Sequence, residues 1–170
     1  MKCIKFIFIV FAITFLTATS YSQTSNPLET MPTTKEAFIK SEPQILKVID
    51  WLENTPLNQE TENRKPMNAT LMEWITNSPT VTLELNLKVT PMSKKNPDLL
   101  MVFMGGWTKY ALQNNYSKDQ IKGTLAGIKS VIKLYKMGGG IKKDKDIEKL
   151  IDLDTKNELE AWITTQLAPK

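Results

Sequence analysis

Apolar residues recur along most of this chain at intervals of three and four, the spacing of one face of an α-helix. The pattern predicts five or six helices, over about 43–53, from 68 onward, over 97–113, over 118–136, over about 145–153 and over about 156–167. Residues 23–42 are rich in Ser, Thr, Pro and Gln and are predicted to form a flexible tail. The fold is therefore predicted to be mostly α, with residues 43–168 as a single helical domain.

Polar residues that commonly begin helices mark several of these boundaries. The expected caps are Asn96, Asn68, Ser117 with Gln120, and Thr155 with Glu158. A long polar loop is expected over 55–68, ahead of the short second helix. The helix after Pro97 is apolar on every side over 99–104, so we expect it at the centre of the domain.

Residues 80–90 (TVTLELNLKVT) break the helical pattern, because valine and leucine alternate there with polar residues. This alternation is typical of a half-buried strand. No second segment matches it, and a lone strand would leave its backbone groups unpaired. The segment is therefore an extended stretch lying on helices, a strand that pairs with a partner chain, or a helix whose pattern misleads.

The N-terminus has the layout of a secretory signal peptide. Two lysines precede the apolar run 6–16, and Ser20 and Ser22 lie at the −3 and −1 positions of a cleavage site before Gln23. The run has 11 residues, whereas a membrane-spanning helix needs about 20. We expect residues 1–22 to be removed and the mature chain, which then has no transmembrane segment, to be periplasmic or extracellular.

The composition excludes several kinds of chemistry. Histidine is absent, Arg64 is the only arginine, and the single cysteine, Cys3, lies within the predicted signal peptide. A Ser-His-Asp triad, a Cys-His pair, a zinc site built from Cys and His, and a disulfide in the mature chain are therefore excluded. We expect no enzymatic activity, no cofactor and no metal, since no catalytic or ligating pattern stands in their place.

Two acidic patterns lack what their chemistry requires. Five acids lie close together near the C-terminus: Asp144, Asp146, Glu148, Asp152 and Asp154. A calcium loop that began at Asp144 would need glycine where Lys149 stands, so no calcium site is predicted. Glu73 lies between Met72 and Trp74, a setting that general acids use, but no partner carboxylate accompanies it.

Gly105 and Gly106 lie inside the apolar run MVFMGGWTKYAL, where each glycine should cost about 1 kcal/mol relative to alanine. The simplest interpretation is a tight crossing with the next helix, which has its own face of small residues at Gly123, Gly127 and Ser130. The alternative is a slot for a small apolar ligand, with six candidate lining residues: Met101, Met104, Gly105, Gly106, Trp107 and Tyr110.

Five lysines fall within about 60° of one another on the helix predicted over 118–136: Lys118, Lys122, Lys129, Lys133 and Lys136. Residues 118–145 contain eight lysines against two acids, in a mature chain whose net charge is only +2. The face is either simply solvated, or it binds an anionic surface such as lipid headgroups, acidic glycans or an acidic protein. Nucleic acid is a less favoured partner, because the chain is predicted to be exported and no aromatic residues interleave with the lysines.

We therefore predict an exported, non-enzymatic helical binding protein of the cell envelope, which engages an anionic surface or acidic partner through these lysines. One alternative is a carrier of a small apolar ligand in an interior lined by Trp and Met. Another alternative is a hydrolase that uses carboxylates. The sequence leaves the identity of the partner open.

Overall fold

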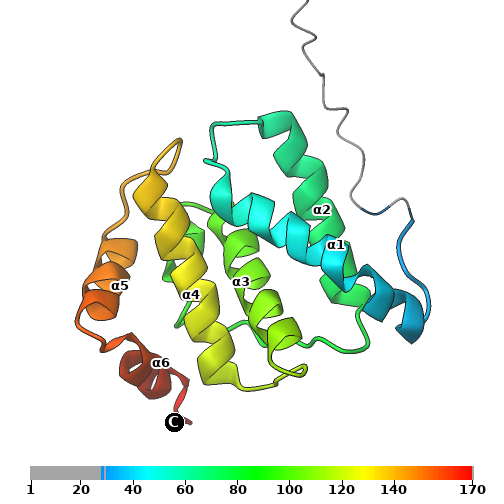
Figure 1. Ribbon diagram of the computed structural model, residues 1–170. Helices are drawn as coiled ribbons and strands as arrows, with labels where there is room; N and C mark the ends of the chain where they lie inside the picture. The colour runs from blue at the N-terminus through cyan, green and yellow to red at the C-terminus, as the bar shows by residue number, and fades with distance from the viewer. Residues whose placement is uncertain (1–27, 29, 170) are drawn as a thin grey trace, which may run out of the picture.

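The computed structural model describes residues 28 and 30–169, and within them the chain forms six α-helices and no strand (Figure 1). The helices are α1 (Lys35–Asn54), α2 (Thr61–Asn77), α3 (Leu99–Gln113), α4 (Gln120–Met137), α5 (Lys145–Thr155) and α6 (Leu159–Leu167), with a short 3-10 helix η1 (Pro91–Lys94) before α3. The predicted all-α fold is confirmed. The predicted signal peptide, 1–22, lies outside the described residues. Among the described helices, none combines the length and the apolar character that crossing a bilayer demands.

The central position predicted for α3 is confirmed, because this helix packs against neighbours on two sides. Figure 1 shows α1 and α2 on one side of it and α4, α5 and α6 on the other. One apolar cluster fills the space toward α4–α6 and includes Val102, Phe103 and Trp107 of α3. The second cluster lies toward α1 and α2, around Ile49 and Trp74.

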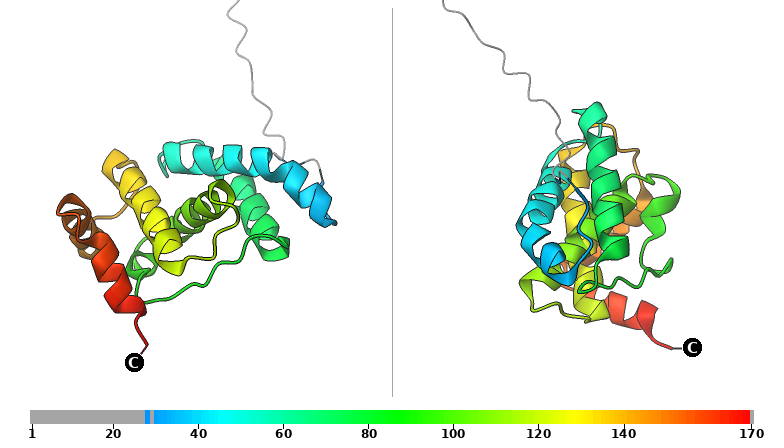
Figure 2. Two further views of the ribbon diagram at one scale, coloured as in Figure 1. Left: turned by 60° about the horizontal axis from the view of Figure 1, so that its bottom comes forward. Right: turned by 90° about the vertical axis from the view of Figure 1, so that its right-hand side faces the viewer.

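Helix α1 begins at Lys35, earlier than the predicted start at Pro43, so residues 35–42 of the expected tail are helical. The Thr34 hydroxyl caps this end by accepting a hydrogen bond from the Ala37 amide at 3.2 Å. Phe38 is buried and packs edge-on against Trp74, with ring centroids 5.6 Å apart. Pro43 stays within α1, and the N-terminal part of this helix turns away from the rest of it (Figure 2, left).

Helix α2 begins at Thr61, so the predicted loop over 55–68 is wrong in its second half and Asn68 is not a cap. Glu60 has a left-handed backbone (φ 45°) and its side chain accepts a hydrogen bond from Asn63 Nδ2 at 2.9 Å. The first two turns of α2 are mostly polar and include Pro66, so they show no apolar period from which a helix could be predicted.

Asn96 is not the N-cap of α3, which is Asp98. The Asn96 side chain instead holds the loop before α5: its Oδ1 accepts a hydrogen bond from the Lys142 amide at 2.9 Å, and its Nδ2 donates to the Lys142 carbonyl at 3.0 Å. Nδ2 also lies 3.3 Å from Asp144 Oδ2. A good capping residue in the sequence has therefore been used for a contact across the fold.

The two predicted capping boxes also fail in detail. Asp119 caps α4, because its Oδ1 accepts a hydrogen bond from the Lys122 amide at 3.0 Å, while Ser117 bonds the amide of Asp119 itself. Thr155 is the last residue of α5, and its hydroxyl donates to the Ile151 carbonyl at 2.8 Å. The predicted break between the last two helices is nevertheless correct, since α6 starts at Leu159.

The segment 80–90 is neither helix nor strand, and it lies along the helices as the first interpretation proposed. Figure 2 shows it running from the end of α2 along the edge of the molecule toward α6. Val81 and Val89 are buried, but Leu85 and Leu87 are 49% and 80% exposed, so the alternation does not map onto a single buried face. Lys88 fixes its far end by donating from Nζ to the Gln166 carbonyl at 3.3 Å.

Candidate functional site: the lysine face of α4

Helix α4 crosses α3 through glycines, which explains why both helices tolerate them. A Cβ on Gly127 would lie 2.7 Å from the Phe103 carbonyl oxygen, and one on Gly123 would overlap the Trp107 indole. In the other direction, a Cβ on Gly106 would meet the side chain of Ser130 and lie 2.9 Å from the Ala126 carbonyl oxygen. The two backbones approach closely, and the packing of Phe103 and Trp107 offsets the low helix propensity of glycine.

The six residues of the candidate apolar slot face different neighbours. Gly106 faces α4, whereas a Cβ on Gly105 would point toward α1 and α2, at 3.3 Å from Ile49 Cγ2 and 3.4 Å from Leu71 Cδ2. Met104 and Trp107 are buried in the cluster that α3 shares with α4–α6, while Met101 and Tyr110 are half-buried. The glycines are thus accounted for by contacts between helices.

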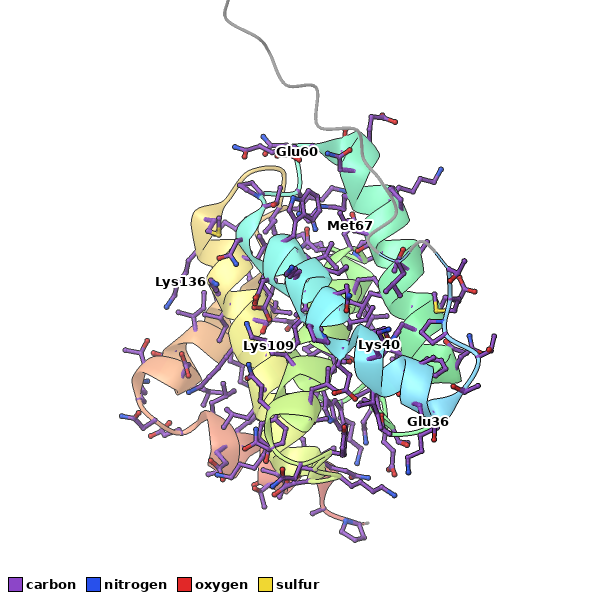
Figure 3. All side chains as sticks on the ribbon, turned by 45° about the vertical axis from the view of Figure 1, so that its right-hand side comes forward. Glu36, Lys40, Glu60, Met67, Lys109 and Lys136 are labelled. Atoms are coloured by element: carbon purple, nitrogen blue, oxygen red, sulfur yellow. The ribbon has the colours of Figure 1, made fainter. Side chains whose placement is uncertain are left out.

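The five lysines of the predicted stripe are all exposed, and they occupy the side of α4 that its neighbours leave open. We call Lys118, Lys122, Lys129, Lys133 and Lys136 the lysine face; Lys118 lies just before the first residue of the helix. The small residues of α4 are turned to α3, and its larger apolar residues pack on α5 and α6. Figure 3 shows Lys136 pointing away from α4.

Two of these lysines are paired with acids that the sequence pattern did not connect to them. Lys122 Nζ lies 2.7 Å from Glu160 Oε1, and Lys129 Nζ lies 3.8 Å from Asp154 Oδ1. The hydrogen bond and charge of Glu160 raise the pKa of Lys122 above its ordinary value, so this lysine stays protonated. Within the described chain, Lys118, Lys133 and Lys136 form no ion pair. The positive charge left available lies mainly near the C-terminal end of α4.

A polar junction beside the lysine face joins α1, α3 and α4, and it was not predicted from the sequence. Lys109 Nζ of α3 lies 2.6 Å from Asp50 Oδ1 and 3.1 Å from Glu53 Oε2, both on α1. Ser130 of α4 donates its hydroxyl hydrogen to Glu53 Oε1 at 2.6 Å. Glu53 is buried. Its burial could have been predicted from the sequence, because Glu53 follows Ile49 by four residues and so lies on the apolar face of α1.

Lys109 remains charged in this junction. Burial by itself would lower the pKa of Lys109, but the hydrogen bonds to Asp50 and Glu53 outweigh it and raise the pKa above the ordinary value. A protonated lysine cannot accept the proton of Ser130, and the Ser130 hydroxyl donates to Glu53. The contacts fix α1 against α3 and α4, and so position the helix that presents the lysine face.

The acids near the C-terminus are used in separate contacts. Asp144 is buried and caps α5, accepting a hydrogen bond from the Asp146 amide at 3.0 Å. Asp152 pairs with Lys156 at 2.8 Å and Asp154 with Lys129. Within the described residues, no group of three or more acidic, cysteine or histidine side chains is placed to hold a metal ion. Glu73 is exposed on α2.

Comparisons of the chain with protein-family models, with curated proteins and with solved structures find no match. The fold and the geometry of the lysine face are therefore the grounds for a functional proposal.

Proposed function

We propose that this protein is a non-enzymatic binding protein, exported to the cell envelope, that engages an anionic surface through the lysine face of α4. The observation that carries the proposal is the open side of α4, where Lys118, Lys133 and Lys136 are exposed and form no ion pair within the described chain. Export to the envelope rests on the sequence alone, through the layout of residues 1–22.

The spacing of the lysines suggests how they would act. From Lys122 to Lys136 the helix rises by about 21 Å, which exceeds the Debye length of about 8 Å at 0.15 M salt. At that ionic strength each lysine attracts only the anionic groups that lie close to it. A lysine whose charge is paired with Glu160 or Asp154 therefore contributes less to binding. Near an anionic membrane each available lysine is worth about 1 kcal/mol. Lys133 and Lys136 should therefore dominate binding.

The packed crossing of α3 and α4 supports a binding surface over a carrier of a small apolar ligand. Phe103, Trp107 and Ser130 occupy the space beside the glycines that a ligand would have needed. We therefore propose that α3 has the structural role of supporting α4, and that the residues on the outer side of α4 bind the partner.

Two double variants on the same face test this function. Lys133→Gln with Lys136→Gln removes unpaired lysines, whereas Lys122→Gln with Lys129→Gln removes paired ones and changes the net charge equally. At 0.15 M salt the first should weaken co-sedimentation with phosphatidylserine vesicles by up to about thirtyfold, at about 1 kcal/mol per lysine. The second should change it only a few-fold. At about 0.01 M salt, where the Debye length is about 30 Å, the two should converge.

Circular dichroism of both variants controls for folding, and neutral phosphatidylcholine vesicles control for unspecific adsorption. Equal losses in the two variants at 0.15 M salt would show that only net charge matters. If the unmutated protein does not sediment with anionic vesicles at either salt concentration, the lysine face is an ordinary solvated surface.

A further inference from the structure

Arg64, the only arginine of the chain, is buried on α2 with 6% of its surface exposed. Its Nη2 donates a hydrogen bond to the Thr55 carbonyl at the C-terminal end of α1, and its guanidinium lies over the Trp51 ring at 5.3 Å from the centroid. A cation suits this place, because the C-terminus of a helix carries partial negative charge and an aromatic face attracts a guanidinium. These contacts explain why the side chain folds inward.

The contacts do not use all of the hydrogen-bonding capacity of Arg64. Among the residues that the structure describes, its Nε has no hydrogen-bond partner, and neither does Asn68 Oδ1, one turn further along α2. No carboxylate of the described chain pairs with the guanidinium, although Asp98 is near enough to act on it electrostatically. Buried polar groups normally have a hydrogen-bond partner, so these two atoms are unusual.

A hollow of about 240 Å³ lies beside these groups, lined by Leu57, Thr61, Arg64, Lys65, Asn68 and Asp98. It is smaller than the 300–1,000 Å³ typical of pockets for drug-sized ligands, so it suits a small solute. The hollow has a cationic side, Arg64 and Lys65, and an anionic group, Asp98. Arg64 and Asp98 line the same space, and they form no salt bridge with each other within the described residues.

We propose that this hollow binds a small zwitterion of the α-amino acid class. Its carboxylate would accept hydrogen bonds from Arg64 and Lys65, and its ammonium group would donate to the Asp98 carboxylate. A phosphate dianion fits less well, because Asp98 repels it; a metal cation is disfavoured by Arg64 and Lys65. This site is separate from the lysine face and does not depend on the proposed function.

Asp98→Asn is the decisive variant, because Asp98 is exposed and its side chain makes no capping hydrogen bond to α3. Titration calorimetry at pH 7 with glycine and the other common α-amino acids should show at least one that binds with a Kd of about 1 mM or tighter. Acetate, methylammonium and inorganic phosphate each satisfy only one side of the hollow and should bind at least about tenfold more weakly. Asp98→Asn should weaken the amino acid by about tenfold or more.

Asp146→Asn is the matched control, since Asp146 is an exposed acid at the start of α5 and does not line the hollow. It should leave amino acid binding unchanged, and Asp98→Asn should leave vesicle binding unchanged, so failure here is distinguishable from failure of the proposed function. The proposal is overturned if no amino acid binds, if acetate or phosphate binds as tightly as the amino acid, or if Asp98→Asn has the affinity of the unmutated protein.

Discussion

Replacing Gly127 by alanine should destabilise the fold by about 1–3 kcal/mol, although alanine is the better helix former by about 1 kcal/mol. The new Cβ would lie 2.7 Å from both the carbonyl oxygen and the Cδ2 atom of Phe103. The ring can rotate away, but the carbonyl belongs to the backbone of α3. The two helices must therefore separate, and the packing of Phe103 in the central cluster is lost with them.

Gly105→Ala is the matched control for this variant. Its Cβ would approach only side-chain atoms, at 3.3 Å from Ile49 Cγ2 and 3.4 Å from Leu71 Cδ2, and both side chains can shift by a few tenths of an ångström. The free energy gained from the higher helix propensity of alanine then roughly cancels the cost of the tight contact. The free energy of unfolding should therefore change by no more than about 1 kcal/mol. Urea unfolding measures both variants. Equal midpoints for Gly127→Ala and Gly105→Ala would contradict the close crossing of α3 and α4.

Lys109→Met should cost about 2–3 kcal/mol, because it removes the cation of the polar junction and keeps the apolar stem. Glu53 would stay buried with the Ser130 hydroxyl as its remaining side-chain donor. Breaking a fully buried ion pair costs about 3–5 kcal/mol, and the value here is reduced because the Lys109 side chain is 28% exposed. Asp50→Asn is the control, since the Asp50 side chain is 55% exposed and its pair should be worth at most about 1 kcal/mol.

The pH dependence of this effect has a definite sign. The pKa of Lys109 is raised in the folded protein, so its contribution is fully present below the unfolded pKa of about 10.4 and is lost as the pH rises through the folded pKa. The difference in stability between the unmutated protein and Lys109→Met should therefore shrink above about pH 10.4. A difference that stays constant into alkaline solution, or a Lys109→Met midpoint equal to that of Asp50→Asn, would show that the junction contributes no electrostatic stability.

The features that could be predicted from the sequence depend on short-range periodicity. The central place of α3 follows from its apolar residues on every side, and the crossing with α4 follows from Gly123 and Gly127 one turn apart. The starts of α1 and α2 were misplaced because a proline lies inside each helix, Pro43 in α1 and Pro66 in α2, and because the first two turns of α2 are mostly polar.

For the candidate site, the sequence predicts that the lysines share one face of a helix, but it does not predict which of them form ion pairs. Periodicity places the lysines on a common face, but the acids that neutralise Lys122 and Lys129 come from α6 and α5, about 25–38 residues away in sequence. The hollow beside Arg64 likewise combines α2 with Asp98, the residue before α3, and only tertiary packing brings them together. A charge count along the chain contains no information on either contact.

Acetylation rates of individual lysines test the central proposal most directly. Mass spectrometry would follow each lysine of the protein with and without phosphatidylserine vesicles at 0.15 M salt. We predict that the vesicles slow the acetylation of Lys133 and Lys136 and leave Lys40 and Lys47, which are exposed on α1, unchanged. Protection of the α1 lysines instead, or vesicle binding with no protection of Lys133 and Lys136, would contradict binding through the lysine face of α4.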